Sequence, residues 1–328
     1  MNITTIRLTL AATVMAATAL TSFSGFAQAQ TWPGQTIKII VPFTPGTGMD
    51  TIARTVSPKL SERLGQPVVV QNTPGASGNI GADNVAKATA DGYTLLMGAN
   101  TMLMASQIYK NVPFNPVDDF SSVSMAAYGT LMLVANPKTG IKSMQDLVTQ
   151  AKAKPGFITY GSPGIGTPHH MAMELFKSKT QLFMLHVPYK GTAGYVTDLL
   201  AGELMVGFLP VHVAQGFVSS GKLTALAVGG NARHPVAPSV ATFQELGVKD
   251  VNVDMWYAFF APQKTPAPVV NRLNTEIAAI MKLPDVRAVL AKAGLDATSS
   301  TTGELTTTVK QDYVRWGSVI KRNSITAE

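Results

Sequence analysis

Short apolar runs alternate along the chain with segments whose apolar residues recur every three or four positions. The run at 37–43 predicts a strand, and the spacing of apolar side chains at 51–64 predicts a helix that ends before Gly65. The continued alternation of strand and helix indicates right-handed βαβ units with parallel strands. The other predicted strands are at 68–70, 93–97, 131–135, 157–161, 184–187, 204–208, 223–228 and 255–261, and the other predicted helices are at 79–88, 144–153, 168–177, 193–201, 269–281 and 305–320.

These elements divide into two α/β lobes of similar size. The boundary is expected near Gly129 and Thr130, and the chain is expected to return to the first lobe near Asp254. The first lobe is therefore discontinuous, formed by residues 30–130 and 254–328, and residues 131–253 form the second lobe.

The N-terminal residues have the pattern of a secretory signal peptide. Arg7 is followed by an uncharged apolar stretch at 8–20, by small polar residues and by Ala27-Gln28-Ala29. An uncleaved membrane anchor is the alternative, but the apolar stretch is shorter than the roughly 20 residues that a spanning helix needs. Residues 1–29 are therefore predicted to be a signal peptide that is cleaved after Ala29 during export.

Composition narrows the class of protein. The 328 residues are 46% hydrophobic and 14% charged, which allows a large buried core and excludes a disordered chain. The chain has no cysteine, but a core of this size folds without disulfides, so export remains the prediction. The formal net charge is +7, but the basic residues are scattered singly, so no nucleic-acid partner is expected. The positive charge is instead expected to attract anionic solutes weakly.

Two glycine loops stand at matching positions in the two lobes. The sequence 45–48 follows the first predicted strand and opens a helix, and the sequence 163–166 does the same in the second lobe. Glycines let backbone N–H groups approach an anion, and the start of a helix adds partial positive charge. Two facing loops of this kind favour a site for a carboxylate or phosphate, although each loop alone could be an ordinary tight turn.

Other chemistries fail on spacing. A dinucleotide loop would need glycine or alanine where Thr51 stands, no Gly-Lys-Ser/Thr phosphate loop is present, and the G-x-S-x-G pattern of hydrolases fails at Asn79. His169 and His170 are adjacent and point about 100° apart on a helix, so they cannot chelate one metal ion together. We therefore expect no catalytic residue, no metal and no cofactor.

Six segments of the chain form a characteristic series. They are VPFTPGTGMDTIAR (41–54), NTPGASGNIGAD (72–83), ADGYTLLMG (90–98), YGSPGIGTPHHMAMELF (160–176), HVPYKG (186–191) and FFAPQKTP (259–266). Taken in this order, they resemble the Bug family of extracytoplasmic solute receptors of tripartite tricarboxylate transporters. The resemblance covers essentially the whole chain after the signal peptide.

The resemblance implies a two-lobed α/β periplasmic binding protein of the type II, Venus-flytrap kind, with a ligand cleft between the lobes. Such a receptor captures a small carboxylic acid without catalysis and delivers it to the membrane subunits of the transporter, and it is expected to be a monomer. Two other classes stay open: a co-receptor for a membrane sensor kinase, and an enzyme that acts on carboxylates.

The family holds one carboxylate with backbone amides and hydroxyls of both lobes. Asp50 could instead cap its helix, as aspartate often does. Carried onto this sequence, the residues that hold the carboxylate are Thr47, Gly48 and Asp50 in the first loop, Ala76 and Ser77 in the second, and Ser162, Thr167 and His170 in the second lobe. The other predicted ligand-binding residues are Phe43, Met49, Thr101, Met205 and Phe208.

Two positions depart from the family pattern. Met205 stands where many members have an acidic residue, and Leu209 stands where a polar residue is common. If both border the cleft, an apolar wall would favour an aromatic carboxylate over aliphatic tricarboxylates. An aliphatic di- or tricarboxylate remains the alternative ligand.

Overall fold

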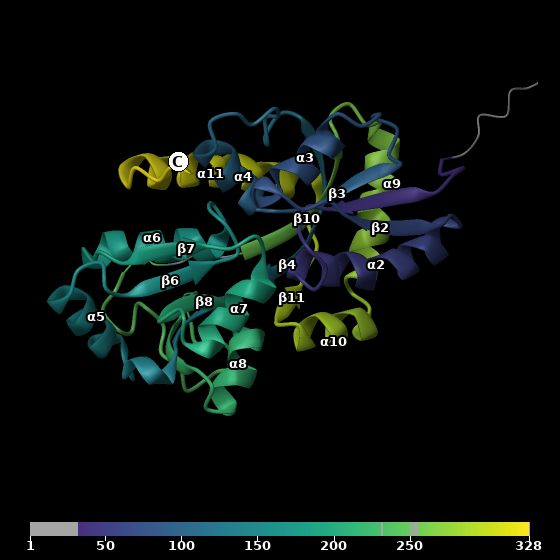
Figure 1. Cartoon of the computed structure of the whole chain (residues 1–328). Helices are drawn as coiled ribbons and strands as arrows, with labels where there is room; N and C mark the ends of the chain where they lie inside the picture. Colours follow the sequence, from purple (N-terminus) through teal and green to yellow (C-terminus); the bar gives the residue numbers. More distant parts are fainter. Residues whose placement is uncertain (1–31, 231, 250, 252–254, 328) are drawn as a thin grey trace, which may run out of the picture. The chain divides into compact units, whose positions relative to one another are not determined.

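The computed structural model describes residues 32–230, 232–249, 251 and 255–327. The predicted signal peptide, its cleavage site at Ala29 and the return point at Asp254 lie outside these residues. Within the part that is described, no helix is long and apolar enough to cross a bilayer. The folded body from Gln35 onward contains two mixed sheets flanked by helices (Figure 1).

The first sheet has the strand order β11-β4-β10-β3-β1-β2. Its first three strands in the chain are parallel to one another, as predicted, but β10 is antiparallel to β3 and β4, and β11 is antiparallel to β4. The sheet is therefore mixed, because β10 and β11 run opposite to the other four strands, which departs from the expected parallel sheet. The strands are β1 (Ile37–Val41), β2 (Val68–Asn72), β3 (Thr94–Ala99), β4 (Phe120–Gly129), β10 (Met255–Pro262) and β11 (Leu295–Ala297).

The second sheet has the order β7-β6-β8-β5-β9. Strand β6 is parallel to β7 and β8, whereas β5 is antiparallel to β8 and β9. The chain passes from the first sheet to the second between Gly129 and Leu131 and re-enters the first sheet at Met255. The strands are β5 (Leu131–Ala135), β6 (Thr159–Ser162), β7 (Leu185–Pro188), β8 (Val206–Pro210) and β9 (Thr224–Val228).

Local signals explain where most helices begin and end. Helix α2 starts after Thr47, whose side chain accepts from the Asp50 N–H, and it ends at Gly65 in the left-handed conformation. Ser143 caps α5, which covers the predicted helix at 144–153. The sequence did not predict α4, α8 or α10. The helices are α2 (Gly48–Leu64), α3 (Asn79–Ala86), α4 (Thr101–Ile108), α5 (Met144–Ala153), α6 (Pro168–Thr180), α7 (Thr192–Ala201), α8 (Val211–Ser219), α9 (Ala267–Ile280), α10 (Pro284–Lys292) and α11 (Thr302–Arg322), with 3₁₀ turns at Ala76–Gly78 and Pro137–Thr139.

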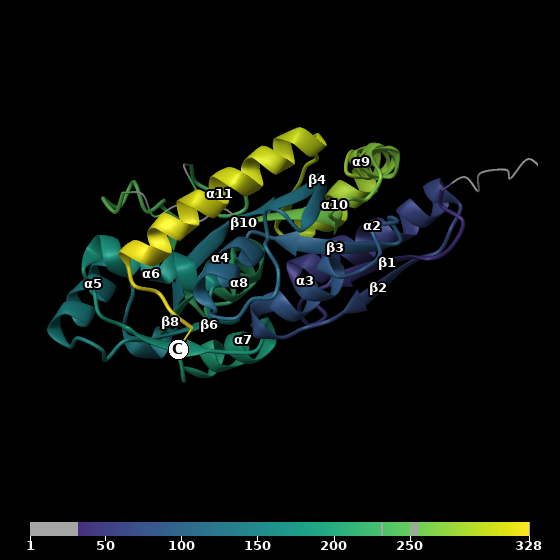
Figure 2. The same ribbon diagram turned by 90° about the horizontal axis from the view of Figure 1, so that it is seen from above.

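Each sheet has its own hydrophobic core. The first core joins β3, β4 and β10 to α4 and to Leu305 and Val309 of α11, and the second joins β5 and β8 to α7 and α8. Helix α11 packs on α4 and β4, so the C-terminal helix belongs to the first core, and Figure 2 shows it crossing above the molecule toward α6. Two separate cores make two lobes, which leaves the region between them for a ligand.

Candidate functional site

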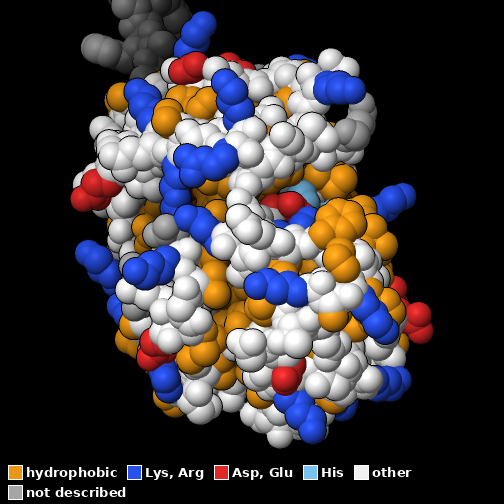
Figure 3. Space-filling model, turned by 90° about the vertical axis from the view of Figure 1, so that its left-hand side faces the viewer, with side chains coloured by type: hydrophobic (Ala, Val, Ile, Leu, Met, Phe, Trp, Pro, Cys, Tyr) orange, Lys and Arg blue, Asp and Glu red, His pale blue; other side chains and the backbone are white. Residues whose placement is uncertain are grey.

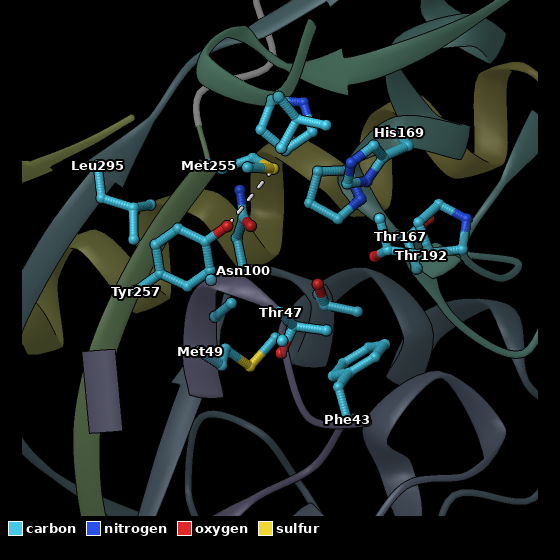
Figure 4. A pocket seen from close by; sticks show the side chains of 18 of the residues that line it. Phe43, Thr47, Met49, Asn100, Thr167, His169, Thr192, Met255, Tyr257 and Leu295 are labelled. Carbon is cyan, nitrogen blue, oxygen red and sulfur yellow. Dashed lines mark hydrogen bonds between the residues drawn. The ribbon is translucent and has the colours of Figure 1, made fainter. Parts of the chain in front are cut away.

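Five helices begin around one cavity between the two sheets. Its lining includes residues from the start of α2, α4, α6, α7 and α8, and Figure 4 shows Thr47 and Met49 on one side of it and Thr167, His169 and Thr192 on another. The cavity volume is about 90 Å³. At 10–15 Å³ for each water, that is room for roughly six to nine waters, so the cavity suits a compact solute.

Strand direction explains why the helix starts meet there. Each of these helices follows directly after a strand: β1, β3, β6, β7 and β8 respectively. Strands β1 and β3 are parallel, and so are β6, β7 and β8, so within each sheet their carboxyl ends lie at one edge. Ligand sites in open α/β sheets form beyond this edge.

The cavity has positive character without a positive side chain. Each helix start carries the equivalent of roughly half a positive charge from its aligned peptide dipoles. Among the described residues that line the cavity there is no Lys, Arg, Asp or Glu. The arrangement therefore suits one anionic group held by backbone N–H groups, with an otherwise apolar body.

The first glycine loop is held from behind by Asp50. Its buried carboxylate accepts from the N–H of Gly46 at 3.0 Å, from Nε of Arg54 at 3.0 Å and from Nδ2 of Asn72 at 2.9 Å. Burial alone would raise the pKa of Asp50, but these three donors outweigh burial and hold it below the ordinary value of 3.8. Asp50 therefore shapes the loop and does not line the cavity.

The second glycine loop is held in the same way by His170. Its Nδ1 accepts from the N–H of Gly166 at 3.1 Å, while the hydroxyl of Thr167 caps the helix at the His170 N–H. Ser162 Oγ lies 2.7 Å from His186 Nε2 and also bonds to the loop at Gly164. Burial lowers the pKa of His170 to about 3, so its imidazole is neutral and can accept the amide proton.

Gly48 lets an aromatic side chain pack directly against the first loop. A Cβ at this position would lie 3.0 Å from the Tyr257 hydroxyl oxygen, which is closer than side chains normally approach. Tyr257 comes from β10 and lines the cavity with Met255 of the same strand (Figure 4). Strand β10 therefore forms part of the wall opposite the second lobe.

Ser77 joins the two lobes. Its hydroxyl donates to the carbonyl oxygen of Ile165 in the second glycine loop at 2.6 Å. Ala76 and Ser77 have φ values of 46° and 52°, which non-glycine residues rarely adopt. Ser77 also lines a small apolar recess of about 10 Å³ that shares Phe43 and Met49 with the main cavity.

The structure brings six of the sequence-predicted residues to the cavity. They are Phe43, Thr47, Gly48, Met49, Thr101 and Thr167. Asp50, Ser162 and His170 lie behind the glycine loops, Ser77 lines the recess, and Ala76 lines neither space.

Met205, Phe208 and Leu209 are away from the cavity, which corrects the expectation that they border the cleft. The Met205 N–H bonds to the carbonyl of Thr159, at the end of the sheet where β6 begins, opposite to the edge that carries the glycine loop. Phe208 packs on Phe243 with 5.7 Å between ring centroids, and Leu209 belongs to the core of the second lobe. Both faces of β8 are buried, so its side chains pack in the protein core and are not available to a ligand.

Sequence reasoning missed several residues that line the cavity. Asn100, Thr192 and His212 stand where a strand passes into a helix, so the same strand-to-helix signal that located the glycine loops could have found them. Met255 and Tyr257 belong to a strand that arrives from a distant part of the chain, and no local pattern marks them. Of the adjacent histidines, His169 lines the cavity, whereas the sequence prediction had placed His170 there.

No group of three His, Cys, Asp or Glu side chains in the described residues is arranged to hold a metal ion. On the face seen in Figure 3, Lys and Arg side chains are scattered around a hollow that is bordered by hydrophobic side chains and in which acidic and histidine side chains are visible. The net charge of +7 favours the approach of anions.

Comparison with known proteins gives a consistent result. Residues 52–325 match the family described as Tripartite tricarboxylate transporter family receptor. BugT of Bordetella pertussis is 34% identical over 295 residues, covering 89% of this chain and 90% of BugT. A UPF0065 protein of the same species is 34% identical over 308 residues, covering 94% of this chain and 95% of that protein.

Solved structures show the same fold. A Rhodopseudomonas palustris protein, Rpa4515 with adipate, is 31% identical with a TM-score of 0.85, and the match covers 90% of this chain and 99% of that one. The periplasmic binding protein BugD is 28% identical with a TM-score of 0.84, covering 90% and 99%. MatC from Rhodopseudomonas palustris with bound malate is 26% identical with a TM-score of 0.81, covering 88% and 100%. The expected two-lobed α/β periplasmic binding protein fold is confirmed.

Proposed function

The chain belongs to the tripartite tricarboxylate transporter receptor family, and on that premise we propose that it captures one small carboxylic acid in the cavity and delivers it to the membrane subunits of such a transporter. One observation carries the proposal: five helix starts meet at a cavity that no charged side chain of the described residues lines. Helix starts hold a single carboxylate well, because their first N–H groups have no partner within the helix.

The donors for the carboxylate follow from the first turns of the helices. The N–H groups of Gly48 and Met49 belong to the first turn of α2, and the Thr47 hydroxyl, which accepts from the Asp50 N–H, keeps its own proton to donate. In α6 the first residue is Pro168, which has no N–H, so His169 offers the first amide from the second lobe. An acid bound this way contacts both lobes and favours their closed arrangement.

The body of the acid faces apolar walls. Phe43, Met49, Val213, Met255 and Leu295 all line the cavity. The predicted preference for an aromatic carboxylate therefore rests on these residues and not on Met205 or Leu209. Short aliphatic diacids are the alternative, because the Rhodopseudomonas palustris relatives were solved with adipate and with malate.

Several finer expectations belong to the same proposal. The protein is exported to the periplasm after cleavage near Ala29, acts as a monomer and binds the acid without turnover. Its first lobe comprises 30–130 and 254–328 and its second lobe 131–253, which is supported by the change of sheet between Gly129 and Leu131.

The test compares acids with their methyl esters. Benzoate and adipate are titrated into the purified mature protein by calorimetry, alongside methyl benzoate and dimethyl adipate. We expect at least one acid to bind and its ester to bind more than tenfold more weakly, because each lost charge-assisted hydrogen bond costs about 1.5–3 kcal/mol. Equal affinity for acid and ester would contradict the proposal, and a new product in the NMR spectrum of the incubated acid would contradict binding without turnover.

A further inference from the structure

Two histidines of the second lobe line the cavity and carry ring nitrogens without a hydrogen-bond partner among the described residues. Both ring nitrogens of His169 and Nδ1 of His212 are buried and have no hydrogen-bond partner among the described residues. Buried polar atoms in folded proteins are nearly always hydrogen-bonded. Unused nitrogens at the wall of a cavity therefore point to a ligand group that satisfies them.

The polar side chain next to His169 already has another hydrogen-bond partner. Its ring lies edge-on to Tyr195, with 6.4 Å between centroids and 77° between planes. The Tyr195 hydroxyl donates to the carbonyl oxygen of Phe208 at 2.6 Å, so its proton is not available to His169. The His169 side chain is 8% exposed, which leaves solvent little access. A group inside the cavity is the remaining partner.

His212 reaches the first lobe. A Cβ on Gly294, which precedes β11, would lie 2.1 Å from His212 Nδ1. The absence of a side chain at Gly294 thus allows the imidazole to enter the contact between the lobes. His212 is the second residue of α8 and His169 the second residue of α6, so the two rings stand at equivalent places on two helix starts.

Both rings are neutral, which determines what they can recognise. Burial lowers the pKa of His169 to about 3, and burial together with His234 lowers the pKa of His212 to about 4. A neutral imidazole offers one donor and one acceptor. A hydroxyl group has the same pair of capacities, whereas a second carboxylate would be buried without a counter-ion, since no Lys or Arg is among the described residues of the lining.

We infer that His169 and His212 form a second subsite, which binds a hydroxyl group carried by the acid at the end remote from its carboxylate. The inference rests on the proposed function, because it takes the carboxylate to be held at the helix starts. The ligands of the protein are then hydroxy acids with an apolar body.

The experiment uses two matched sets of acids that differ only in the remote group. The aromatic set is benzoate, 4-hydroxybenzoate and terephthalate, and the aliphatic set is hexanoate, 6-hydroxyhexanoate and adipate. Affinities of the full mature protein are measured by calorimetry in two buffers with different ionisation enthalpies, which reports proton uptake. In whichever of the two sets binds in the cavity, the hydroxy acid is expected to bind roughly tenfold more tightly than the unsubstituted acid, with no proton uptake.

Variants assign the gain to the histidines. His169→Leu and His212→Leu are expected to remove the tenfold gain from the hydroxyl, measured in each variant as the ratio of its affinities for the hydroxy acid and the unsubstituted acid. His169→Gln and His212→Gln keep a donor and an acceptor and are expected to restore part of it. His234→Leu, outside the cavity lining, is the matched control and is expected to keep the gain.

The outcomes separate this inference from the proposed function. If an unsubstituted acid binds and the remote hydroxyl adds nothing, or the Leu variants keep the gain, the second subsite is wrong while the carboxylate receptor stands. Tightest binding of terephthalate or adipate, with a proton taken up, would show a subsite for charge and would also overturn the inference. If no acid of either set binds, the proposed function fails with it.

Discussion

The Asp50 carboxylate is the support of the first glycine loop, and its removal gives a quantitative test of the site. Asp50→Ala removes the acceptor of the part-buried Gly46 N–H and one of the two acceptors of Asn72 Nδ2, which also donates to the Phe43 carbonyl, and it ends the ion pair with Arg54. The Asp50 side chain is 6% exposed and that of Arg54 is 52% exposed, so solvent screens the ion pair more than the two other hydrogen bonds.

The two part-buried hydrogen bonds set the magnitude. A hydrogen bond to a charged acceptor contributes about 1.5–3 kcal/mol, so two of them give about 3–6 kcal/mol. Because both bonds are only part-buried, the expected loss in the free energy of unfolding is at the low end, about 3 kcal/mol, with at most about 1 kcal/mol more from the screened pair. Asp50→Asn keeps one acceptor oxygen and should lose less. Acid affinity should fall with stability, because the loop presents the Gly48 and Met49 amides.

The pH dependence has a definite sign. The pKa of folded Asp50 lies below its ordinary value of 3.8, so the folded state favours the ionised form. The stabilisation is therefore fully present above about pH 4 and is lost as the pH falls through the lower folded pKa. The wild type should consequently lose more stability than Asp50→Ala between pH 5 and about pH 2.

Urea unfolding followed by circular dichroism measures both effects. Asp285→Ala is the matched control, because that carboxylate pairs with Lys59 on the surface and is 59% exposed, and its loss should change stability far less. A difference below about 1 kcal/mol between Asp50→Ala and the wild type at pH 7 would refute the account of the loop. Equal loss of stability in both proteins on acidification would refute the sign.

The remaining predictions concern closure and specificity. Gly294→Ala should weaken acid binding by more than roughly tenfold, because the new Cβ meets the His212 ring. The control is Gly247→Ala, which has a similar positive φ but a new Cβ with no atom within 4 Å, so it should leave the affinity unchanged. Small-angle scattering should show a more open arrangement of the lobes in Gly294→Ala than in the wild type. Equal affinities of the two variants would contradict the contact between Gly294 and His212. Met205→Glu should not change the ranking of acids by affinity, whereas Met255→Glu, in the cavity wall, should abolish binding. A thermal-shift panel of acids measures both. An altered ranking in Met205→Glu would contradict the placement of Met205 outside the cavity.

The sequence alone determined the features that depend on neighbours along the chain. Apolar spacing predicted most strands and helices, because burial of one face imposes the helical or strand period. Caps such as Ser143 and Thr47 also act locally, since each accepts from a backbone N–H three residues further along the chain. The two glycine loops were found for the same reason, because a strand, a glycine turn and a helix start follow one another directly.

Other features depend on partners far away in the sequence. Strand β4 reads as mixed Ser and apolar residues and was missed, because its place between β10 and β11 buries both kinds. Strand β10 was predicted, but its antiparallel position between β3 and β4 follows from long-range pairing that no local pattern encodes.

The sequence therefore predicted only some of the residues that line the candidate site. Which of His169 and His170 enters the cavity depends on a rotation of about 100° between successive helix residues, and that rotation is fixed by how α6 packs on its sheet. Met205 was misplaced because family position does not say which end of β8 faces the ligand. The sequence predicted two loops suited to an anion, whereas only the tertiary structure, by bringing the strand-to-helix ends of the two sheets together, decided which side chains line the cavity between them.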